Sequence, residues 1–458
     1  MSKSEKENEK QLLDEAKKYL VQRWEPRQGY KPLVMTRGEG LNVWDAKGKR
    51  YLDFMSQLYN VHIGMGNRVP IEAAKKQLDE LAYASPSYYN KPQIALAKKL
   101  AEITAPSLVQ SFFGNSGTEA NEVAIKLAQL YREAPKIISF WDAYHGSTYS
   151  MVSVGGSARN RQFKGLSIFE EFKHIASPYC YRCPYKKTYP DCELFCAEFL
   201  KYTIEKEGEN TVAAFMAEPI CSWAGQVVPP DGYWKRIREI CDEKGILMIF
   251  DEVMTGFART GKMFAYEHWD IVPDVETYAK GITCGYVPLG ACVISEKMAN
   301  HFDEKGFPHS YTYSGHAVSC ATALAVIDYY EKEKLAENSA KMGAYMMDEL
   351  NGMMDRLKII GDVRGLGLFM GVELVNDRES KESLIPRELP REEKMDPEKN
   401  PMQYFAKKLK LNGLLIGSSW NTSILRMMPA LVITRDEVDE GLGILEATLE
   451  ETTRKFHL

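Results

Sequence analysis

The sequence predicts an α/β fold, in which a largely parallel sheet is covered by helices on both faces and is joined by a smaller α+β domain. Through the middle of the chain, short apolar runs alternate with amphipathic segments, an order typical of parallel sheets. Towards the C-terminus the order changes to helix, strand, helix and strand. The chain of 458 residues also exceeds one ordinary core, so we expect one large and at least one smaller domain.

The large domain is expected to contain apolar strands bounded by polar or turn residues. Four such runs are 136–140, 212–217, 246–250 and 291–294. Between two of them, residues 233–244 carry apolar side chains at helical spacing, and Gly245 follows where a helix would stop. Sheets of this kind bind ligands outside the carboxyl ends of their strands, so we expect the chemistry there.

The smaller layer is expected to combine both ends of the chain. Its predicted helices are 336–351 and 403–411, and its predicted strands are 366–374 and 424–433, with the N-terminal segments 41–45 and 49–54 beside them. A charged stretch with three prolines, 376–400, is predicted to be an exposed loop. We therefore divide the chain into an N-terminal part of the small domain (1–70), a large domain (71–330) and a C-terminal small domain (331–458).

Charge and hydropathy exclude some classes of function. The chain has 58 Lys and Arg residues against 63 Asp and Glu residues, and this balance offers no basic surplus for a nucleic-acid backbone. Its first ten residues form a charge-rich run that lacks the apolar region of a secretory signal. No stretch supplies the ~18 apolar residues of a membrane span. We expect a cytoplasmic protein without nucleic-acid or membrane partners.

Four of the nine cysteines lie close together with the spacing C-x2-C-x8-C-x3-C. They are Cys180, Cys183, Cys192 and Cys196. Two close pairs of thiolates could hold a tetrahedral zinc ion, and such a site would be structural because it leaves no open position. Two disulfides or four free thiols in a surface loop fit the same spacing.

A second segment of interest, 115–122, places small residues at the start of a predicted helix. The free N–H groups and the dipole of a helix start favour an anion such as phosphate. Ser116 and Glu119 have the spacing of a capping box as well, so a purely structural role fits equally.

Three further residues follow apolar runs. Asp251 comes directly after the strand at 246–250, where its charge must be paired or solvated, unless it only caps a turn. Lys280 would become an amine nucleophile if it lies in a desolvated cleft, although lysines are more often exposed. Tyr144 could stack on a flat ring or make an ordinary loop contact.

Together these segments resemble the class-III aminotransferase family of fold-type-I pyridoxal-phosphate (PLP) enzymes, over nearly the whole chain. The most specific matching segment is 251–261, followed by 273–274 and 279–281. Other similar segments are 115–122, 144–146, 218–219 and 312–316. The resemblance implies a mostly parallel, seven-stranded sheet in the large, PLP-binding domain.

The resemblance also implies a role for each site residue. Lys280 would hold the cofactor covalently and move a proton, and Asp251 would pair with the pyridine nitrogen, making the ring an electron sink. Residues around the cofactor would be Gly117 and Thr118 at the phosphate, Val253 and Tyr144 on the two ring faces, Glu218 beside it, and Thr312 reaching the phosphate of a neighbouring subunit. Homodimers or tetramers with shared active sites follow from this.

For the reaction, the resemblance implies ping-pong transamination from an amine donor to a keto-acid acceptor. In some relatives a glutamate masks a substrate-binding arginine, but here Trp223 takes the place of that glutamate, and Arg426 takes the place of the arginine. Arg426 is then available for an anion unless another acid pairs with it. The cysteine-bearing segment and residues 54–61 are similar to taurine and ω-amino-acid transaminases.

We therefore expect an ω-amine or ω-amino acid as donor, of the taurine or β-alanine type, and pyruvate or 2-oxoglutarate as acceptor. The candidate pocket residues are Gln57, Tyr59, Trp223 and Arg426. An aminomutase, racemase, decarboxylase or phospho-lyase would use the same lysine chemistry. A binding protein clamped by metal at the cysteines is the alternative outside enzymes.

Overall fold

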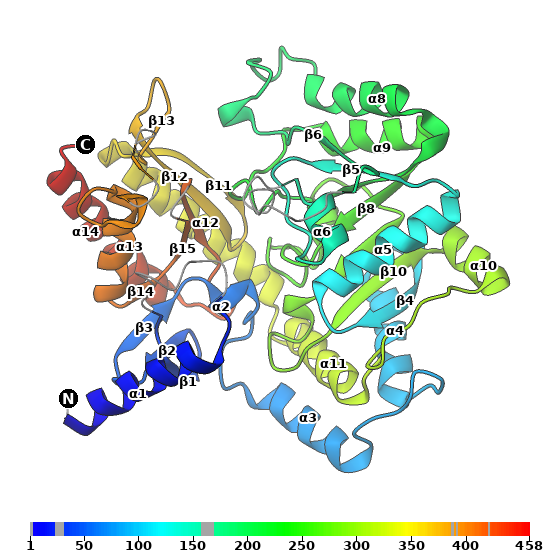
Figure 1. Ribbon diagram of the computed structural model, residues 1–458, viewed down its shortest axis with the longest axis horizontal. Coiled ribbons are helices and arrows are strands. Elements are labelled where there is room, and N and C mark those ends of the chain that lie inside the picture. Colours follow the sequence, from blue (N-terminus) through cyan, green and yellow to red (C-terminus); the bar gives the residue numbers. More distant parts are fainter. Residues whose placement is uncertain (1–2, 23–31, 157–168, 386–388, 391–392, 420–421) are drawn as a thin grey trace.

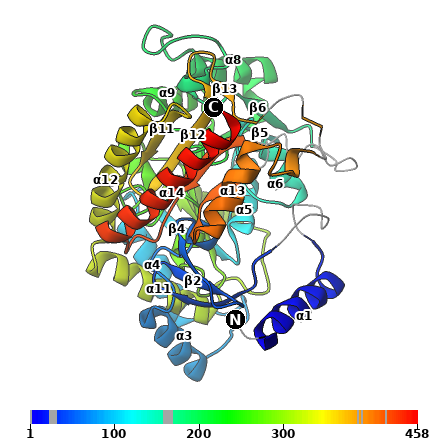
Figure 2. The ribbon, with the colours of Figure 1, turned by 90° about the vertical axis from the view of Figure 1, so that its left-hand side faces the viewer.

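The computed structural model describes residues 3–22, 32–156, 169–385, 389–390, 393–419 and 422–458. Its largest sheet has seven strands in the order β4-β10-β9-β8-β7-β5-β6, and two smaller sheets lie on one side of it (Figure 1). Helix α1 (Lys3–Tyr19) lies at the outer edge of the molecule (Figure 2). No helix in the described ranges is long and apolar enough to cross a membrane.

The central sheet confirms all four strands predicted for the large domain. Its strands are β4 (Leu108–Gly114), β5 (Lys136–Phe140), β6 (Phe172–Ile175), β7 (Val212–Ala217), β8 (Leu247–Asp251), β9 (Val275–Tyr278) and β10 (Gly290–Ser295). Strand β10 pairs antiparallel with both β4 and β9, whereas the pairings among β9, β8, β7, β5 and β6 are parallel. The sheet is therefore mostly parallel, as predicted.

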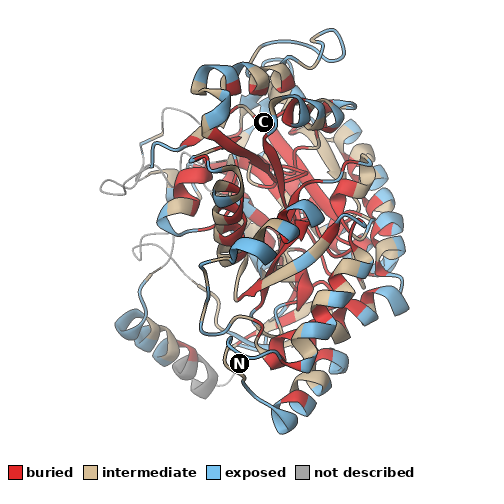
Figure 3. Cartoon of the chain, turned by 90° about the vertical axis from the view of Figure 1, so that its right-hand side faces the viewer, coloured by how far each residue is buried: buried red, intermediate tan, exposed pale blue. Residues whose placement is uncertain are grey.

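Helices cover both faces of this sheet because its strands are apolar on both sides. Along β8, Met248 and Phe250 belong to one hydrophobic cluster, whereas Leu247 and Ile249 belong to another. Helix α9 (Tyr233–Lys244), predicted at these bounds, packs into the first cluster, and α5 (Gly117–Arg132) packs into the second. Figure 3 shows the buried strands between the outer helices.

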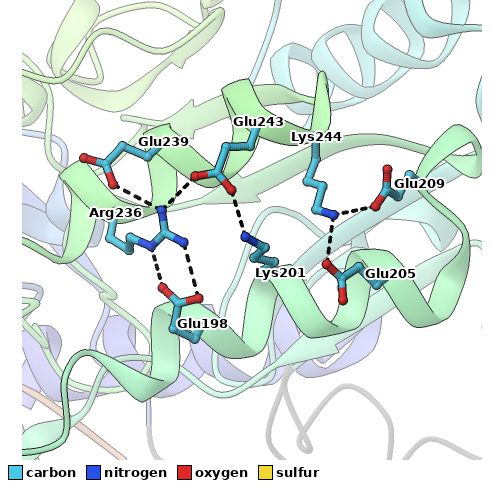
Figure 4. A network of polar contacts seen from close by, with 8 residues as sticks. All are labelled: Glu198, Lys201, Glu205, Glu209, Arg236, Glu239, Glu243 and Lys244. Carbon is cyan, nitrogen blue, oxygen red and sulfur yellow. Dashed lines mark hydrogen bonds and ion pairs between the residues drawn. The ribbon is translucent and has the colours of Figure 1, made fainter.

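The other helices of this part are α3 (Arg68–Glu80), α4 (Lys91–Ile103), α6 (Tyr149–Val154), α8 (Phe195–Glu207), α10 (Glu296–Lys305) and α11 (Ala317–Lys332), with short 3-10 turns at Cys180–Arg182, Glu209–Thr211, Ala265–His268 and Lys280–Ile282. The short helix α2 (Ser56–Tyr59) precedes them in the chain. A network of ion pairs joins α8 to α9 and the residues that follow α8 (Figure 4). Arg236 of α9 binds Glu198 of α8 as well as Glu239 and Glu243 of its own helix.

The smaller layer combines both ends of the chain, as predicted. Its N-terminal strands are β1 (Met35–Glu39), β2 (Asn42–Asp45) and β3 (Arg50–Asp53), and β3 pairs in parallel with β14 (Leu414–Leu415). The remaining elements are α12 (Leu335–Arg356), β11 (Ile360–Leu366), β12 (Phe369–Asp377), β13 (Glu382–Ser383), a 3-10 turn at Glu393–Met395, α13 (Pro401–Leu411), β15 (Gly417–Ser419), β16 (Thr422–Met427) and α14 (Arg435–Phe456).

Two predicted strands have different bounds in the structure. The prediction at 366–374 spans a turn, because Leu366 ends β11 and Gly367, with φ 57°, reverses the chain into β12. The prediction at 424–433 is too long, since β16 ends at Met427. The domain limits at 70 and 330 stay a prediction. Parts of the charged stretch, 386–388 and 391–392, lie outside the described residues.

Candidate active site

A cavity of about 480 Å³ lies where several strands of the central sheet end. Asp251 ends β8, Glu218 follows β7, and Lys280 follows β9. All three line the cavity, and so do Gly117, Thr118, Tyr144 and Val253. The structure thus brings together seven of the eight residues predicted to surround a cofactor.

Asp251 is buried and is held by groups from three elements. Its Oδ2 accepts hydrogen bonds from Asn121 Nδ2 and His145 Nδ1, both at 2.7 Å. Its Oδ1 accepts one from the Val253 N–H at 2.9 Å. A buried carboxylate held in this way stays oriented, so the alternative role of a simple turn cap does not account for its contacts.

Lys280 lies in the cavity rather than on the surface. Burial lowers the pKa of its amino group, while the nearby carboxyls of Asp251 and Glu218 raise it. Its backbone φ of 42° is left-handed, a strained conformation for a residue with a side chain and one found often at functional sites. A lysine with a lowered pKa spends more time as a neutral nucleophile.

The start of α5 fits both roles that the sequence allowed. Ser116 caps the helix, because its Oγ accepts from the Glu119 N–H at 3.2 Å. Gly117 and Thr118 line the cavity at the same helix start. A Cβ on Gly117 would lie 2.8 Å from both Val253 methyl groups, so only glycine lets Val253 approach this closely.

Glu218 is a second buried carboxyl in the cavity. Burial raises its pKa to about 7, although the neighbouring His145 and Lys280 lower it. Ser222 donates a hydrogen bond to its Oε1, whereas Oε2 has no partner among the described residues. This carboxyl can therefore hold or release a proton near neutral pH.

Tyr144, Trp223 and Arg426 form a stack that leads away from the cavity. The rings of Tyr144 and Trp223 are stacked, with centroids 5.2 Å apart and an interplanar angle of 21°. The Arg426 guanidinium lies 5.9 Å from the Trp223 ring and donates to the carbonyls of Trp223 (2.9 Å) and Ser222 (3.4 Å). Within the described ranges its hydrogen bonds are to these carbonyls, and it forms no ion pair with an acidic residue there.

The other predicted pocket residues are less central. Gln57 does not line the cavity, and its side chain donates to Asp53 Oδ2 at 2.7 Å. Tyr59 packs in a small apolar cluster, and burial raises its pKa although the nearby charge of Arg426 acts to lower it. Their neighbours Leu58 and Asn60 line the cavity instead.

Thr312 is exposed and lies outside the lining of the cavity in its own chain. Its carbonyl accepts a hydrogen bond from the Tyr83 hydroxyl at 2.9 Å.

The structure corrects the zinc hypothesis. The four clustered cysteines are free thiols that line one small pocket with Tyr179 and Tyr185. No group of three or more His, Cys, Asp or Glu side chains within the described residues could hold a metal ion. Burial raises the pKa of Cys196 to about 12 and also raises that of Cys180.

Sequence reasoning missed Asn121 and His145, which hold Asp251. Both lie inside segments that resembled the family, but nothing in the local pattern showed that they share an acceptor. Such a contact joins residues more than 100 positions apart, so it becomes visible only in the folded chain.

The cavity suits a flat, phosphorylated aldehyde cofactor. A helix start offers N–H groups to the phosphate, and Gly117 leaves room for Val253 to pack against a ring. A clamped carboxylate, a lysine in the cavity and a stacking aromatic complete the set that a PLP site of fold type I requires.

Comparison with known proteins identifies the family. The model of the class-III aminotransferases matches residues 25–449. A leucine/methionine racemase of Thermococcus litoralis is 36% identical over 427 residues, covering 92% of this chain and 91% of the relative. The taurine–pyruvate aminotransferase of Bilophila wadsworthia is 33% identical over 467 residues, covering 96% and 97%.

A solved structure agrees. The taurine:2-oxoglutarate aminotransferase of Bifidobacterium kashiwanohense, in complex with PLP and glutamate, superimposes with a TM-score of 0.91 at 32% identity, covering 97% of this chain and 98% of that one. The chain belongs to the class-III aminotransferases, which are PLP-dependent.

Proposed function

We propose that Lys280 and Asp251 are the catalytic residues of a transaminase. PLP, when bound, supplies an electron sink for the substrate carbon. Lys280 Nζ, as the free amine, would move a proton from that carbon to the carbon of the cofactor that carried the aldehyde, and would move a proton in the opposite sense in the second half of the cycle. Asp251 carries the negative charge that holds a proton on the ring nitrogen. Gly117 and Thr118 hold the phosphate, while Val253, Tyr144 and Glu218 enclose the ring.

We propose an ω-amine or ω-amino acid of the taurine or β-alanine type as donor and pyruvate or 2-oxoglutarate as acceptor. The observation that carries this proposal is Arg426, a partly buried cation without an acidic partner among the described residues. A charge that is partly withdrawn from water favours a counter-charge, and a substrate carboxylate or sulfonate would supply it. The taurine aminotransferases among the relatives support the same choice.

Racemisation is the second candidate, because a leucine/methionine racemase is a close relative. Incubating the holoenzyme with one amine and no keto acid separates the two reactions. A transaminase releases one carbonyl product per bound cofactor and then stops. A racemase interconverts enantiomers of an amino acid without releasing a carbonyl compound.

We propose a homodimer or a tetramer with shared active sites, located in the cytoplasm. The exposed position of Thr312, outside its own cavity, supports a role at a partner's phosphate. We expect the Thr312→Ala variant to bind PLP more weakly than the parent, while light scattering gives the same mass for both proteins. Unchanged PLP affinity would remove this role.

A further inference from the structure

Asn121 has no assigned role, yet it touches three parts of the site. It lies one turn into α5, the helix whose first residues Gly117 and Thr118 line the cavity. Its side chain is 1% exposed. Its amide nitrogen donates to Asp251 Oδ2 at 2.7 Å and to the His145 carbonyl at 2.8 Å, and its Oδ1 accepts from the Thr277 hydroxyl at 2.5 Å.

The orientation of this amide is fixed by its neighbours. Asp251 Oδ2 and the His145 carbonyl are both acceptors, so turning the amide over would place its oxygen against two other oxygens. Thr277, on strand β9, donates to the remaining side of the amide. Asn121 therefore joins α5, the end of β8, β9 and the loop after β5 through one rigid group.

These contacts also distinguish the two oxygens of Asp251. A carboxylate oxygen accepts about two hydrogen bonds in its plane. Oδ2 already accepts two, from Asn121 and His145, whereas Oδ1 accepts one, from the Val253 N–H. The position still open on Oδ1 is thus the one that can meet a further donor.

We propose that Asn121 is a positioning residue that fixes the Asp251 carboxylate relative to the phosphate-binding start of α5, leaving Oδ1 for the ring nitrogen of the cofactor. Donors on Oδ2 also stabilise the ionised carboxylate, which keeps the proton on the ring nitrogen. This inference rests on the role proposed above for Asp251, but it is independent of the identity of the donor and acceptor.

The test replaces Asn121 by leucine, which has a similar shape and no hydrogen-bonding group. Without the donor from Asn121, Asp251 would hold a proton more tightly. The ring nitrogen of the cofactor would then be protonated less often, so less positive charge would lie near Lys280 Nζ. The visible absorption of the lysine-bound cofactor should then titrate about one pH unit higher than in the parent. We expect kcat to fall about tenfold or more, as for the loss of a hydrogen bond to a charged group, with little change in KM.

A matched control is Asn400→Leu. Asn400 is fully buried, caps α13 through the Met402 N–H and donates to the Lys394 carbonyl, outside the site. It should lower the melting temperature without moving the titration. Asn121→Leu with a parental titration and a lowered melting temperature would show a structural role only and would overturn the inference.

Two further variants keep the result decisive. Thr277→Val removes the donor to Asn121 Oδ1 and should shift the titration in the same direction by less, so an unchanged midpoint contradicts the inference even if Asn121→Leu does not fold. Asp251→Asn tests the underlying role. If Asp251→Asn leaves the titration unchanged, the role of Asp251 falls, and the inference falls with it. If Asp251→Asn shifts the titration and both other variants do not, only the inference about Asn121 falls.

Discussion

Replacing Arg426 by glutamine should weaken reactions of substrates that carry an acidic group and spare those that do not. Glutamine keeps an amide donor for the carbonyls of Ser222 and Trp223, which Arg426 now binds at 3.4 and 2.9 Å. The local backbone therefore keeps part of its hydrogen bonding. The change removes mainly the positive charge.

The expected size follows from the contacts of the guanidinium. Arginine has five N–H donors, and two of them bind these carbonyls. A hydrogen bond from a charged donor to a substrate anion is worth about 1.5–3 kcal/mol, which corresponds to roughly a 10- to 150-fold loss in kcat/KM. Burial lowers the pKa of Arg426, because a charge without a counter-charge is unfavourable away from water. Removing this charge should therefore change the free energy of unfolding only slightly.

The assay follows each half-reaction in a single turnover. Taurine, β-alanine, pyruvate and 2-oxoglutarate carry an acidic group, whereas an amine without one serves as the matched donor. Arg364→Gln is the control variant, since Arg364 also donates to a backbone carbonyl, that of Gly225, but is already paired with Asp362 and Glu373. An equal loss for acid-bearing and acid-free donors in Arg426→Gln would refute the anion role.

Three further predictions concern stability and cofactor binding. Burial and the nearby Glu252 raise the pKa of Glu276 well above its usual value, so folding favours the protonated carboxyl, and the protein loses stability as pH rises between the pKa values of the unfolded and folded states. In that range the parent should lose up to about 1.4 kcal/mol of unfolding free energy per pH unit, and Glu276→Gln should not show this loss. Denaturant titrations in which the unfolding free energies of parent and variant change equally with pH would contradict this. Gly117→Ala puts a methyl group 2.8 Å from Val253 and should raise the PLP dissociation constant roughly tenfold, as measured by dialysis of the apoenzyme, whereas an unchanged constant would mean that Val253 moves freely. Arg236→Gln breaks the α8–α9 network and should cost about 0.5–1 kcal/mol at low salt and less at 1 M salt, so a loss that does not depend on salt would show that packing rather than charge is responsible.

Local pattern was enough for the elements whose periodicity is undisturbed. The helix at 233–244 has one apolar face and ends at Gly245, which is left-handed in the structure, so both its type and its bounds were predictable. The predicted start of strand β12, residue 366, lies before its observed start at Phe369, because the apolar residues of the strand continue an apolar run through the hairpin turn. Glycine at 367 was the signal for that turn.

Within the site, residues at strand ends could be predicted because a parallel sheet gathers them at one edge. Asp251 and Lys280 belong to this group. The roles of Asn121 and His145 could not be predicted, because both side chains bind Asp251 Oδ2, and no spacing in the sequence shows that they share this acceptor. The cysteine cluster shows the opposite error, in which a suggestive spacing did not produce a metal geometry.

The reversed direction of β10 has a consequence for how this pocket can change. Because β10 runs opposite to β9, the chain between them turns back at one edge of the sheet instead of crossing to the other. That single loop, residues 279–289, carries Lys280 and also supplies the wall from Gly285 to Leu289. At the end of this loop Gly290 packs directly against the Ser116 backbone, since a Cβ on Gly290 would lie 2.2 Å from the Ser116 carbonyl oxygen. Substitutions or insertions in its middle could therefore reshape the substrate entrance while the sheet and the helix start keep their places.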